Sequence, residues 1–379
     1  MKIAYIYDGH YPSTGADAGQ VINTAIALSR QGAEVSLFCA SPLQQAPLDT
    51  ASILQHYSLE GVLEIIQLPR RKFQPRFIHK WSHCVAAVRS IKERGFDLVY
   101  SRNILAIRMA LNQGMNAVYD TYRPWPKQYF LMRWLFQSLF KNQRLIGGFF
   151  HSVLARQAYV DVGIRPEKLR VAHNGFHPES YRNLPSLEEA KAELNLPQDK
   201  LVIGYTGRLD IEKGMLTLLD VAEQSTEIHL LLAGGGKDQL VFDRAETLPN
   251  VSVLPWQKPS YVPTLLSACD VLMIPSSSIA LKTGNTVLPM KIFEYLASGR
   301  PIVAPRSPDT ADVLTHDDNA WLVETDDSQL LTKELLYLRD HLELRQRLAK
   351  RAKERSDELT WDARGQKIMY SIQTWLTKK

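Results

Sequence analysis

Short apolar runs alternate with amphipathic segments along the first part of the chain, which is the pattern of parallel strands separated by helices. KIAYIY (2–7) predicts a buried strand, a glycine-containing loop follows, and the helical stretch VINTAIALSRQG leads into a second strand, EVSLFCA (34–40). This order is one βαβ unit. Further elements are expected at 63–68, 97–101 and 116–120 as strands and around Ser82 to Glu93 as a helix.

The pattern restarts near residue 200. LPSLEEAKAELNLPQDK (184–200) is polar and predicts a linker with a short helix. A second set of strands is expected at 201–207, 228–236, 251–255, 270–276 and 300–305, again with helices between them. Two doubly wound α/β domains are therefore expected, and the helical run 362–376 could pack on either of them.

The composition is that of an ordinary globular protein: of the 379 residues, 45% are apolar and 22% are charged. No apolar run is long enough for a spanning helix, and the N-terminal stretch lacks the features of a secretory signal. The three cysteines, Cys39, Cys84 and Cys269, lie far apart in apolar segments, without metal-ligand spacing or a disulfide pattern. Reduced core thiols in a cytoplasmic protein are therefore expected.

The net charge of +5 is mild, but the basic residues cluster. PRRKFQPRFIHKW (69–81) and KQYFLMRWLFQSLFKNQRLIGGFF (127–150) both mix lysine and arginine with aromatic residues. A basic aromatic helix can bind at the interface of an anionic membrane, so peripheral membrane contact through these segments is one interpretation. The other is a helix whose aromatic side packs in the core. Nucleic-acid binding is disfavoured, because no recognised nucleic-acid module accompanies the patches.

In sheets of this kind ligands bind beyond the carboxyl ends of the strands, and a cleft between two domains is the default site. GYTGRLDIEKG places Gly207 at the end of a strand and Arg208 and Lys213 just beyond it. A planar guanidinium and an ammonium beside a tight glycine turn suit a diphosphate. Alternatively, both are solvated bases that pair with the neighbouring acids Asp210 and Glu212.

A small, polar stretch before the helix near Met290 could hold phosphate through free N–H groups at the helix start. Glu294 lies about one turn further into that helix, so its carboxylate could accept hydrogen bonds from vicinal hydroxyls such as those of a ribose. It could equally be a solvated helix residue. In the N-terminal loop, Gly15 could let the backbone meet a phosphate, or the loop could be an ordinary flexible one.

Taken in order, these motifs resemble the retaining glycosyltransferases of family 4, which have the GT-B fold and use activated sugar donors. HNGFHPES (173–180), GRLDIEKG and PMKIFEYLASGRPIVA carry the resemblance, which extends over nearly the whole chain. It implies an α/β architecture of two facing Rossmann-like, doubly wound domains with a central cleft. The acceptor-side domain would span 1–180 and the donor-binding domain 185–361, with the C-terminal helix 362–379 packing back on the first domain.

The resemblance also implies roles for individual residues. Arg208 and Lys213 fall in the diphosphate-binding places, and Glu294 falls in the ribose-binding place. These residues would hold the donor while negative charge develops on the leaving phosphate.

Two departures from the family pattern matter. Thr286 stands where a second glutamate often lies near the donor sugar, so the backbone amides of residues 286–289, or Lys282 and Asn285, would have to contact that sugar. Tyr122 stands about where a histidine often lies near the transferred sugar, with Asp120 nearby. The expected donor-binding residues are Gly15, Gly207, Arg208, Lys213, Asn285, Thr286, Val287, Leu288, Pro289 and Glu294, and the expected catalytic residues are Arg208, Lys213, Tyr122 and Asp120, with His151 and His173 in reserve.

The implied reaction is transfer of a hexosyl or related sugar from a nucleotide-sugar donor to an acceptor hydroxyl, with retention and without a metal or other cofactor. The product would be a cell-surface polysaccharide, a glycolipid or a related glycan. A lipid-linked acceptor at the inner face of the cytoplasmic membrane would fit the basic aromatic first half. The alternatives are a catalytically degenerate nucleotide-sugar-binding partner protein and a nucleotide-sugar epimerase on the same fold. A dinucleotide oxidoreductase is disfavoured, since no G-x-G-x-x-G precedes the first helix.

Overall fold

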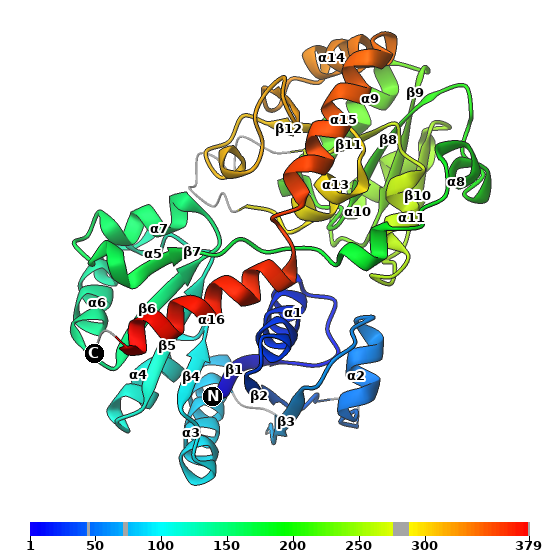
Figure 1. The fold of residues 1–379 in the computed structure, drawn as a ribbon. Helices are drawn as coiled ribbons and strands as arrows, with labels where there is room; N and C mark the ends of the chain where they lie inside the picture. Colours follow the sequence, from blue (N-terminus) through cyan, green and yellow to red (C-terminus); the bar gives the residue numbers. More distant parts are fainter. Residues whose placement is uncertain (44–45, 71–74, 276–287, 378–379) are drawn as a thin grey trace. The chain divides into compact units, whose positions relative to one another are not determined.

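The computed structural model describes residues 1–379 except 44–45, 71–74, 276–287 and 378–379 (Figure 1). Contacts within the chain divide it into two compact units, Met1–Gly175 with Trp361–Lys379, and Phe176–Thr360. The boundaries expected from the sequence differ from these by a few residues, because Phe176 and Tyr181 pack in the apolar core of the second unit.

The first unit is built on a parallel seven-stranded sheet with the order β3-β2-β1-β4-β5-β6-β7. Its strands are β1 (Lys2–His10), β2 (Glu34–Ala40), β3 (Glu64–Leu68), β4 (Leu98–Ser101), β5 (Asn116–Thr121), β6 (Leu145–Phe150) and β7 (Leu169–Val171). The first five confirm the strands predicted for this region, and β6 and β7 are additional to them.

The basic aromatic segment 127–150 is not one amphipathic helix, contrary to the expectation from its composition. It contains the end of α5 (Trp125–Gln128), the whole of α6 (Phe130–Lys141) and then β6. All six residues of β6 are buried in the sheet. The prediction is therefore wrong for 145–150, which cannot take part in any surface contact.

Helices cover both faces of this sheet. On one face, α1 (Ala16–Arg30) and α16 (Trp361–Thr377) lie beside each other, as Figure 1 shows, and α2 (Thr50–His56) contributes to the same core. On the other face, one apolar cluster joins α3, α4, α6 and α7. The bounds not yet given are α3 (Arg76–Arg94), α4 (Ile104–Asn112) and α7 (Val153–Val160).

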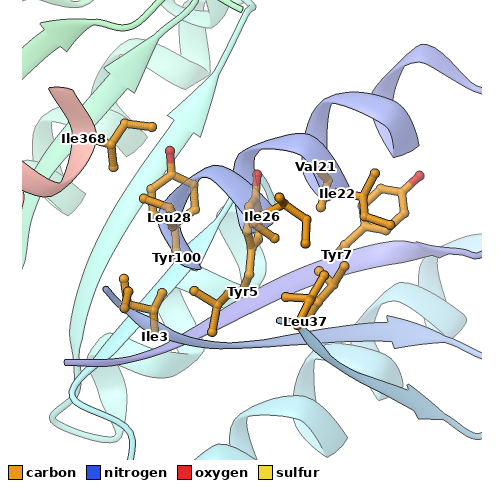
Figure 2. Packing of buried hydrophobic residues seen from close by; sticks show 14 of the residues in the cluster. Ile3, Tyr5, Tyr7, Val21, Ile22, Ile26, Leu28, Leu37, Tyr100 and Ile368 are labelled. Atoms are coloured by element: carbon orange, nitrogen blue, oxygen red, sulfur yellow. The ribbon is translucent and has the colours of Figure 1, made fainter. Parts of the chain in front are cut away.

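The core on the α1 face forms because apolar residues recur along α1 at helical spacing and therefore point at the strands. Figure 2 shows this packing, with Val21, Ile22, Ile26 and Leu28 of α1 gathered with Ile3, Tyr5, Tyr7, Leu37 and Tyr100 of the strands. Ile368 of α16 belongs to the same cluster (Figure 2). The last helix of the described chain is thus part of the core of the first unit.

The second unit is a parallel six-stranded sheet with the order β10-β9-β8-β11-β12-β13. Its strands are β8 (Leu201–Thr206), β9 (Ile228–Ala233), β10 (Val251–Leu254), β11 (Val271–Met273), β12 (Ile302–Pro305) and β13 (Trp321–Val323). Its helices are α8 (Leu187–Glu193), α9 (Met215–Gln224), α10 (Gln239–Thr247), α11 (Val262–Ser267), α13 (Lys291–Ser298), α14 (Ser328–Asp340) and α15 (Leu342–Ser356). The five strands predicted for this region are confirmed as β8 to β12, with ends shifted by a few residues, and β13 is additional to them.

All three cysteine thiols are buried and unpaired, which confirms their prediction as core residues. Burial raises the pKa of each thiol to about 12, so they are protonated at neutral pH. None of the helices in the described part of the chain is long and apolar enough to cross a membrane.

His83 is a buried histidine of α3, and within the described part of the chain neither of its ring nitrogens has a side-chain or backbone hydrogen bond of normal geometry. Burial lowers its pKa to about 4, so the folded chain holds the imidazole neutral where the unfolded chain would protonate it. Because the unfolded chain binds this proton more readily, the free energy of unfolding decreases as the pH falls from about 6.5 toward 4.

We therefore expect His83→Phe to flatten the acid side of the stability profile. At pH 5 the protonation difference is worth about 2 kcal/mol in the free energy of unfolding of the first unit. Amide hydrogen exchange in β1 to β5 at pH 7 and pH 5 would measure it. The matched control is His341→Phe, at an exposed histidine. Equal pH dependence in the parent and the His83 variant would contradict the prediction.

Candidate functional site

Two glycine turns lie against each other at the carboxyl edge of the second sheet. Gly207 follows β8 and donates its N–H to the carbonyl oxygen of Ala233 at 2.8 Å. Gly207 and Gly234 have φ angles of 136° and 151°, in the region that favours glycine. A Cβ on Gly234 would lie 1.8 Å from the Gly207 carbonyl oxygen. Side-chain-free turns are therefore required here, and they leave the backbone of this edge open to a ligand.

Arg208 is held beside these turns by a buried carboxylate. Its Nη1 donates to Oδ2 of Asp210 at 2.9 Å, and Oδ1 of Asp210 accepts the N–H of Lys237 at 3.0 Å. Asp210 thus ties the Arg208 loop to the glycine turn after β9. The pairing expected as the alternative to ligand binding is present, yet the Arg208 side chain is 60% exposed. Most of its donors therefore stay available to a ligand.

Two lysines lie close to Arg208. Lys213, at the end of a short 3₁₀ turn (Ile211–Lys213), is partly buried and forms no ion pair with any residue the structure describes. Burial and the nearby Arg208 lower its pKa. Lys291 is the first residue of α13, and its ammonium lies 3.5 Å from the centre of the Tyr205 ring. Burial, followed by the charges of Lys213 and Arg208, holds the pKa of Lys291 well below its usual range.

Glu294 lies one helical turn beyond Lys291 on α13. Burial raises the pKa of its carboxyl group to about 7, while Lys291 acts in the opposite direction. Leu288 is buried and Pro289 is partly exposed immediately before the helix. The other expected sugar-contacting residues, Asn285, Thr286, Val287 and Lys282, lie outside the described residues.

Gly207, Arg208, Lys213 and Glu294 are thus brought together, and Lys291 joins them. The group contains three cations, while Asp210 is paired and Glu294 is not fully ionised at neutral pH. Such an excess of positive charge beside an open backbone turn suits an anion carrying two or more charges. The sequence motif contained Lys291, but only its contact with Tyr205 on β8 shows that it points to this edge.

The remaining expected site residues lie in the first unit, around Asp120 at the end of β5. Asp120 is fully buried, and its carboxylate accepts hydrogen bonds from Tyr100 at 2.6 Å and Arg364 at 2.7 Å and contacts His151 at 2.6 Å. Burial alone would raise its pKa, but Arg364 and His151 together lower it well below its usual range. With both oxygens occupied, Asp120 is placed to position His151 and Arg364 rather than to touch a substrate.

His151 follows β6 and is buried as well. Burial lowers its pKa to about 4, so the imidazole is neutral at pH 7. Its Nε2 contacts Asp120 and lies 3.5 Å from the side-chain nitrogen of Gln20, while its Nδ1 lies 3.5 Å from that of Asn174. His173, the other reserve histidine, precedes Asn174, and its carbonyl oxygen accepts a hydrogen bond from Arg364 at 3.2 Å.

Tyr122 is partly exposed just after β5, and two guanidinium groups lie close to its ring. The Cζ atoms of Arg102 and Arg123 are 4.9 and 5.3 Å from the ring centre. Arg102 directly follows β4 and was not expected as a site residue, because nothing in the sequence around it distinguishes it from a solvated base. Gly15, with φ of −68°, is the N-cap of α1, and its N–H donates to Ser13 at 3.2 Å.

Among the described residues, no group of three or more histidine, cysteine, aspartate or glutamate side chains is arranged to hold a metal ion. The candidate site residues of the second unit are mainly cationic, whereas those of the first unit include both acidic and basic side chains. A diphosphate-class anion is the ligand that the second unit fits best.

Two family models match the chain, one for each half. The model described as glycosyltransferase family 4 matches residues 19–180, and the model described as glycosyl transferases group 1 matches residues 186–355. Arg208, Lys213, Lys291 and Glu294 all fall within the second of these.

Curated relatives match at modest identity. A lipopolysaccharide core biosynthesis glycosyltransferase of Rhizobium meliloti is 31% identical over 172 residues, which is 44% of this chain and 48% of the relative. A sulfoquinovosyl transferase of Arabidopsis thaliana is 24% identical over 294 residues, 73% of this chain and 55% of the relative. The chain therefore spans about half the length of these relatives.

Solved structures match over the whole chain. HepE of Anabaena, in complex with UDP and glucose, has a TM-score of 0.75 at 17% identity and covers 98% of this chain and 99% of its own. The sucrose-phosphate synthase of Thermosynechococcus elongatus has a TM-score of 0.79 at 18% identity and covers 100% of both chains. At these identities the likeness shows the fold, and it confirms the predicted GT-B class of two Rossmann-like domains.

Proposed function

Because the chain belongs to the family 4 glycosyltransferases of group 1, we propose that it transfers a sugar from a nucleoside-diphosphate sugar to an acceptor hydroxyl with retention of the anomeric configuration. The observation that carries the proposal is the placement of Arg208 and Lys213 together beside the Gly207 turn. A diphosphate is the leaving group such a site would stabilise.

The chemistry follows from that assignment. The bond between the anomeric carbon and the phosphate oxygen breaks, and negative charge builds on the leaving diphosphate while the sugar gains oxocarbenium character. The acceptor oxygen then bonds to the anomeric carbon on the face the phosphate leaves, and its proton passes to a phosphate oxygen. Arg208 stabilises the developing charge without reorganisation, because Asp210 holds its guanidinium beside the glycine turns. Lys213 adds a second positive charge at the same place.

Glu294 is proposed to accept hydrogen bonds from the ribose hydroxyls of the donor. Its carboxyl group titrates with a pKa of about 7 and is free of ion pairs within the described residues. The acceptor is assigned to the first unit, where Tyr122 and Arg102 are partly exposed beyond the strand ends. Asp120 and His151 behind them fix the local geometry.

Activity with purified protein tests the proposal. UDP-sugars come first in the screen, since the neighbouring structure of HepE contains UDP and glucose, followed by GDP- and ADP-sugars. Release of the nucleoside diphosphate, with the anomeric configuration of the product read by NMR, would support it. An inverted product would reject retention. Donor binding without hydrolysis or transfer, across candidate acceptors, would favour the catalytically degenerate alternative.

We further propose that the acceptor is lipid-linked and that the first unit binds an anionic membrane surface, at the inner face of the cytoplasmic membrane. The supporting observation is the exposure of the N-terminal part of α6. Phe130, Leu131 and Trp134 are 80%, 76% and 73% exposed, whereas the opposite side of the helix packs in the core. Arg133 and Lys141 on the same helix are exposed as well. Three large apolar side chains beside basic ones suit a headgroup interface.

A second exposed apolar group supports the same surface. On α3, Phe77 and Trp81 are 73% and 54% exposed. α3 and α6 contribute to one core cluster and so cover the same face of the sheet. Helices in units of this type run opposite to their strands, which brings the N-terminal turns of both helices to the edge where ligands bind. A membrane-borne acceptor would meet the first unit at that edge.

Vesicle binding measures this contact. The double variant Phe130→Ser, Trp134→Ser is expected to bind vesicles of phosphatidylglycerol and phosphatidylcholine about tenfold more weakly than the parent. Tyr370→Ser, at an exposed aromatic residue of α16, is the matched control and should bind like the parent. No binding by the parent, or equal binding by the double variant, would reject the membrane surface.

A further inference from the structure

Lys291 lies within the donor-binding motif, but its side chain has no role among those assigned from the sequence. Its ammonium lies over the ring of Tyr205 and above the Gly207 turn, where an added Cβ would be 2.7 Å from Nζ. Within the described residues no carboxylate lies within ion-pair distance of that nitrogen. The charged and titratable groups that face it are Arg208 and Lys213 from the loop after β8, Tyr205 from β8, and Glu294 from its own helix.

A purely structural role would need only the aromatic contact. A cation over an aromatic face contributes about 0.5 to 2 kcal/mol, enough to help fix the start of a helix. That role does not account for the placement of the ammonium near two other cations, which disfavours its charged form. An anion bound among the three positive groups would offset that repulsion.

We propose that Lys291 is a third diphosphate-binding residue of this site, and that it takes up a proton when the diphosphate binds. The inference rests on the proposed function. It adds one more diphosphate-binding residue and the uptake of a proton when the diphosphate binds. The nitrogen already lies above the backbone of the turn that Arg208 follows, so it reaches the same phosphate groups without any rearrangement of the chain.

The direction of the proton movement follows from the surroundings. Burial and the like charges of Lys213 and Arg208 lower the pKa of Lys291 in the empty site, which disfavours its charged form. A bound diphosphate raises that pKa, and the amine becomes an ammonium. Ribose contact has the opposite effect on Glu294, whose pKa of about 7 would fall on binding. At pH 8.5 Glu294 is ionised in both states, so the uptake at that pH does not include it.

Calorimetry provides the test. UDP, GDP and ADP are titrated into the protein at pH 8.5 in two buffers of different ionisation enthalpy, and the difference in heat gives the number of protons taken up. The parent is expected to take up a fraction of a proton. Lys291→Met should lose that uptake and bind about tenfold more weakly. Lys291→Arg should bind without uptake, because a guanidinium stays charged. Lys333→Met, at an exposed lysine of α14, should match the parent.

The outcomes separate this inference from the proposed function. Unchanged affinity and unchanged proton uptake in Lys291→Met would overturn the inference, while loss of binding in Arg208→Ala would leave the proposed function standing. If proton uptake persists in Lys291→Arg, the proton binds to Lys213, whose pKa is also lowered. That result would likewise overturn the inference about Lys291. If Arg208→Ala and Lys213→Ala bind all three diphosphates like the parent, the proposed function itself fails. If Lys291→Met does not fold, the proton uptake measured with Lys291→Arg decides whether the inference holds.

Discussion

Replacing Arg208 or Lys213 by alanine is expected to lower the turnover of the donor by about two orders of magnitude. Both side chains lie where the leaving diphosphate would carry its developing charge, and neither is needed for the core. Arg208 is 60% exposed, and Lys213 makes no ion pair with any described residue. The loss should appear in kcat as well as in kcat/KM, because the interaction strengthens in the transition state.

Arg306→Ala is the matched control for Arg208→Ala. Arg306 is also an exposed arginine of the second unit, with a carboxylate, Glu324, 3.7 Å from its Nε. It follows β12 and has no assigned role, so its loss should leave turnover within about twofold of the parent. Unchanged turnover in both Arg208→Ala and Lys213→Ala would remove the diphosphate assignment. A drop of the same size in Arg306→Ala would show a general electrostatic effect instead.

Replacing Arg364 by leucine is expected to destabilise the first unit by about 3 to 5 kcal/mol, the cost of leaving one partner of a buried ion pair alone. Arg364 is 3% exposed, and its guanidinium donates to the Asp120 carboxylate at 2.7 Å and to Thr24 at 3.2 Å. It also donates to the backbone carbonyl oxygens of Ala172 and His173. Without it the Asp120 carboxylate would remain buried and uncompensated. Amide hydrogen exchange in β1 to β7 would measure the loss.

A double-mutant cycle shows whether the charge pair is the cause. Asp120→Asn removes the charge that Arg364 compensates, so the double variant should be much less destabilised than the sum of the two single variants. Exchange in β8 to β13 serves as the internal control, since the substitution lies in the other unit. Additive effects, or a loss below about 1 kcal/mol, would contradict the assigned role.

The strands of this chain were mostly predictable, and the failures have physical causes. β1 to β5 are apolar runs bounded by turn residues, and each was expected. β6 was missed because LIGGFF follows a basic aromatic helix and contains two glycines, which weaken a strand pattern. A Cβ at Gly147 would lie 2.3 Å from the ring of Trp375. The glycine is therefore explained by a side chain of α16, far along the sequence.

The candidate site likewise contains residues that the sequence predicts and residues that only the fold identifies. Four site residues could be predicted because they lie in local motifs whose spacing indicates a phosphate site or a ribose contact: Gly207, Arg208, Lys213 and Glu294. Lys291 needed the fold, since its contact is with Tyr205 on another strand. The roles of residues around Asp120 needed it too. The sequence places an acid near a strand end, but only the fold shows that Tyr100, His151 and Arg364 occupy its oxygens.

The insertion of residues 176–360 between β7 and α16 has a consequence for synthesis. α16 supplies Ile368, Ile372 and Trp375 to the core of the first unit and Arg364 to its buried ion pair. A ribosome delivers that helix only after the whole of Phe176–Thr360. The second unit can therefore close its core on the nascent chain while the first still exposes one apolar face. The half translated earlier is the last to finish folding, and until then it is the part that chaperones would have to shield.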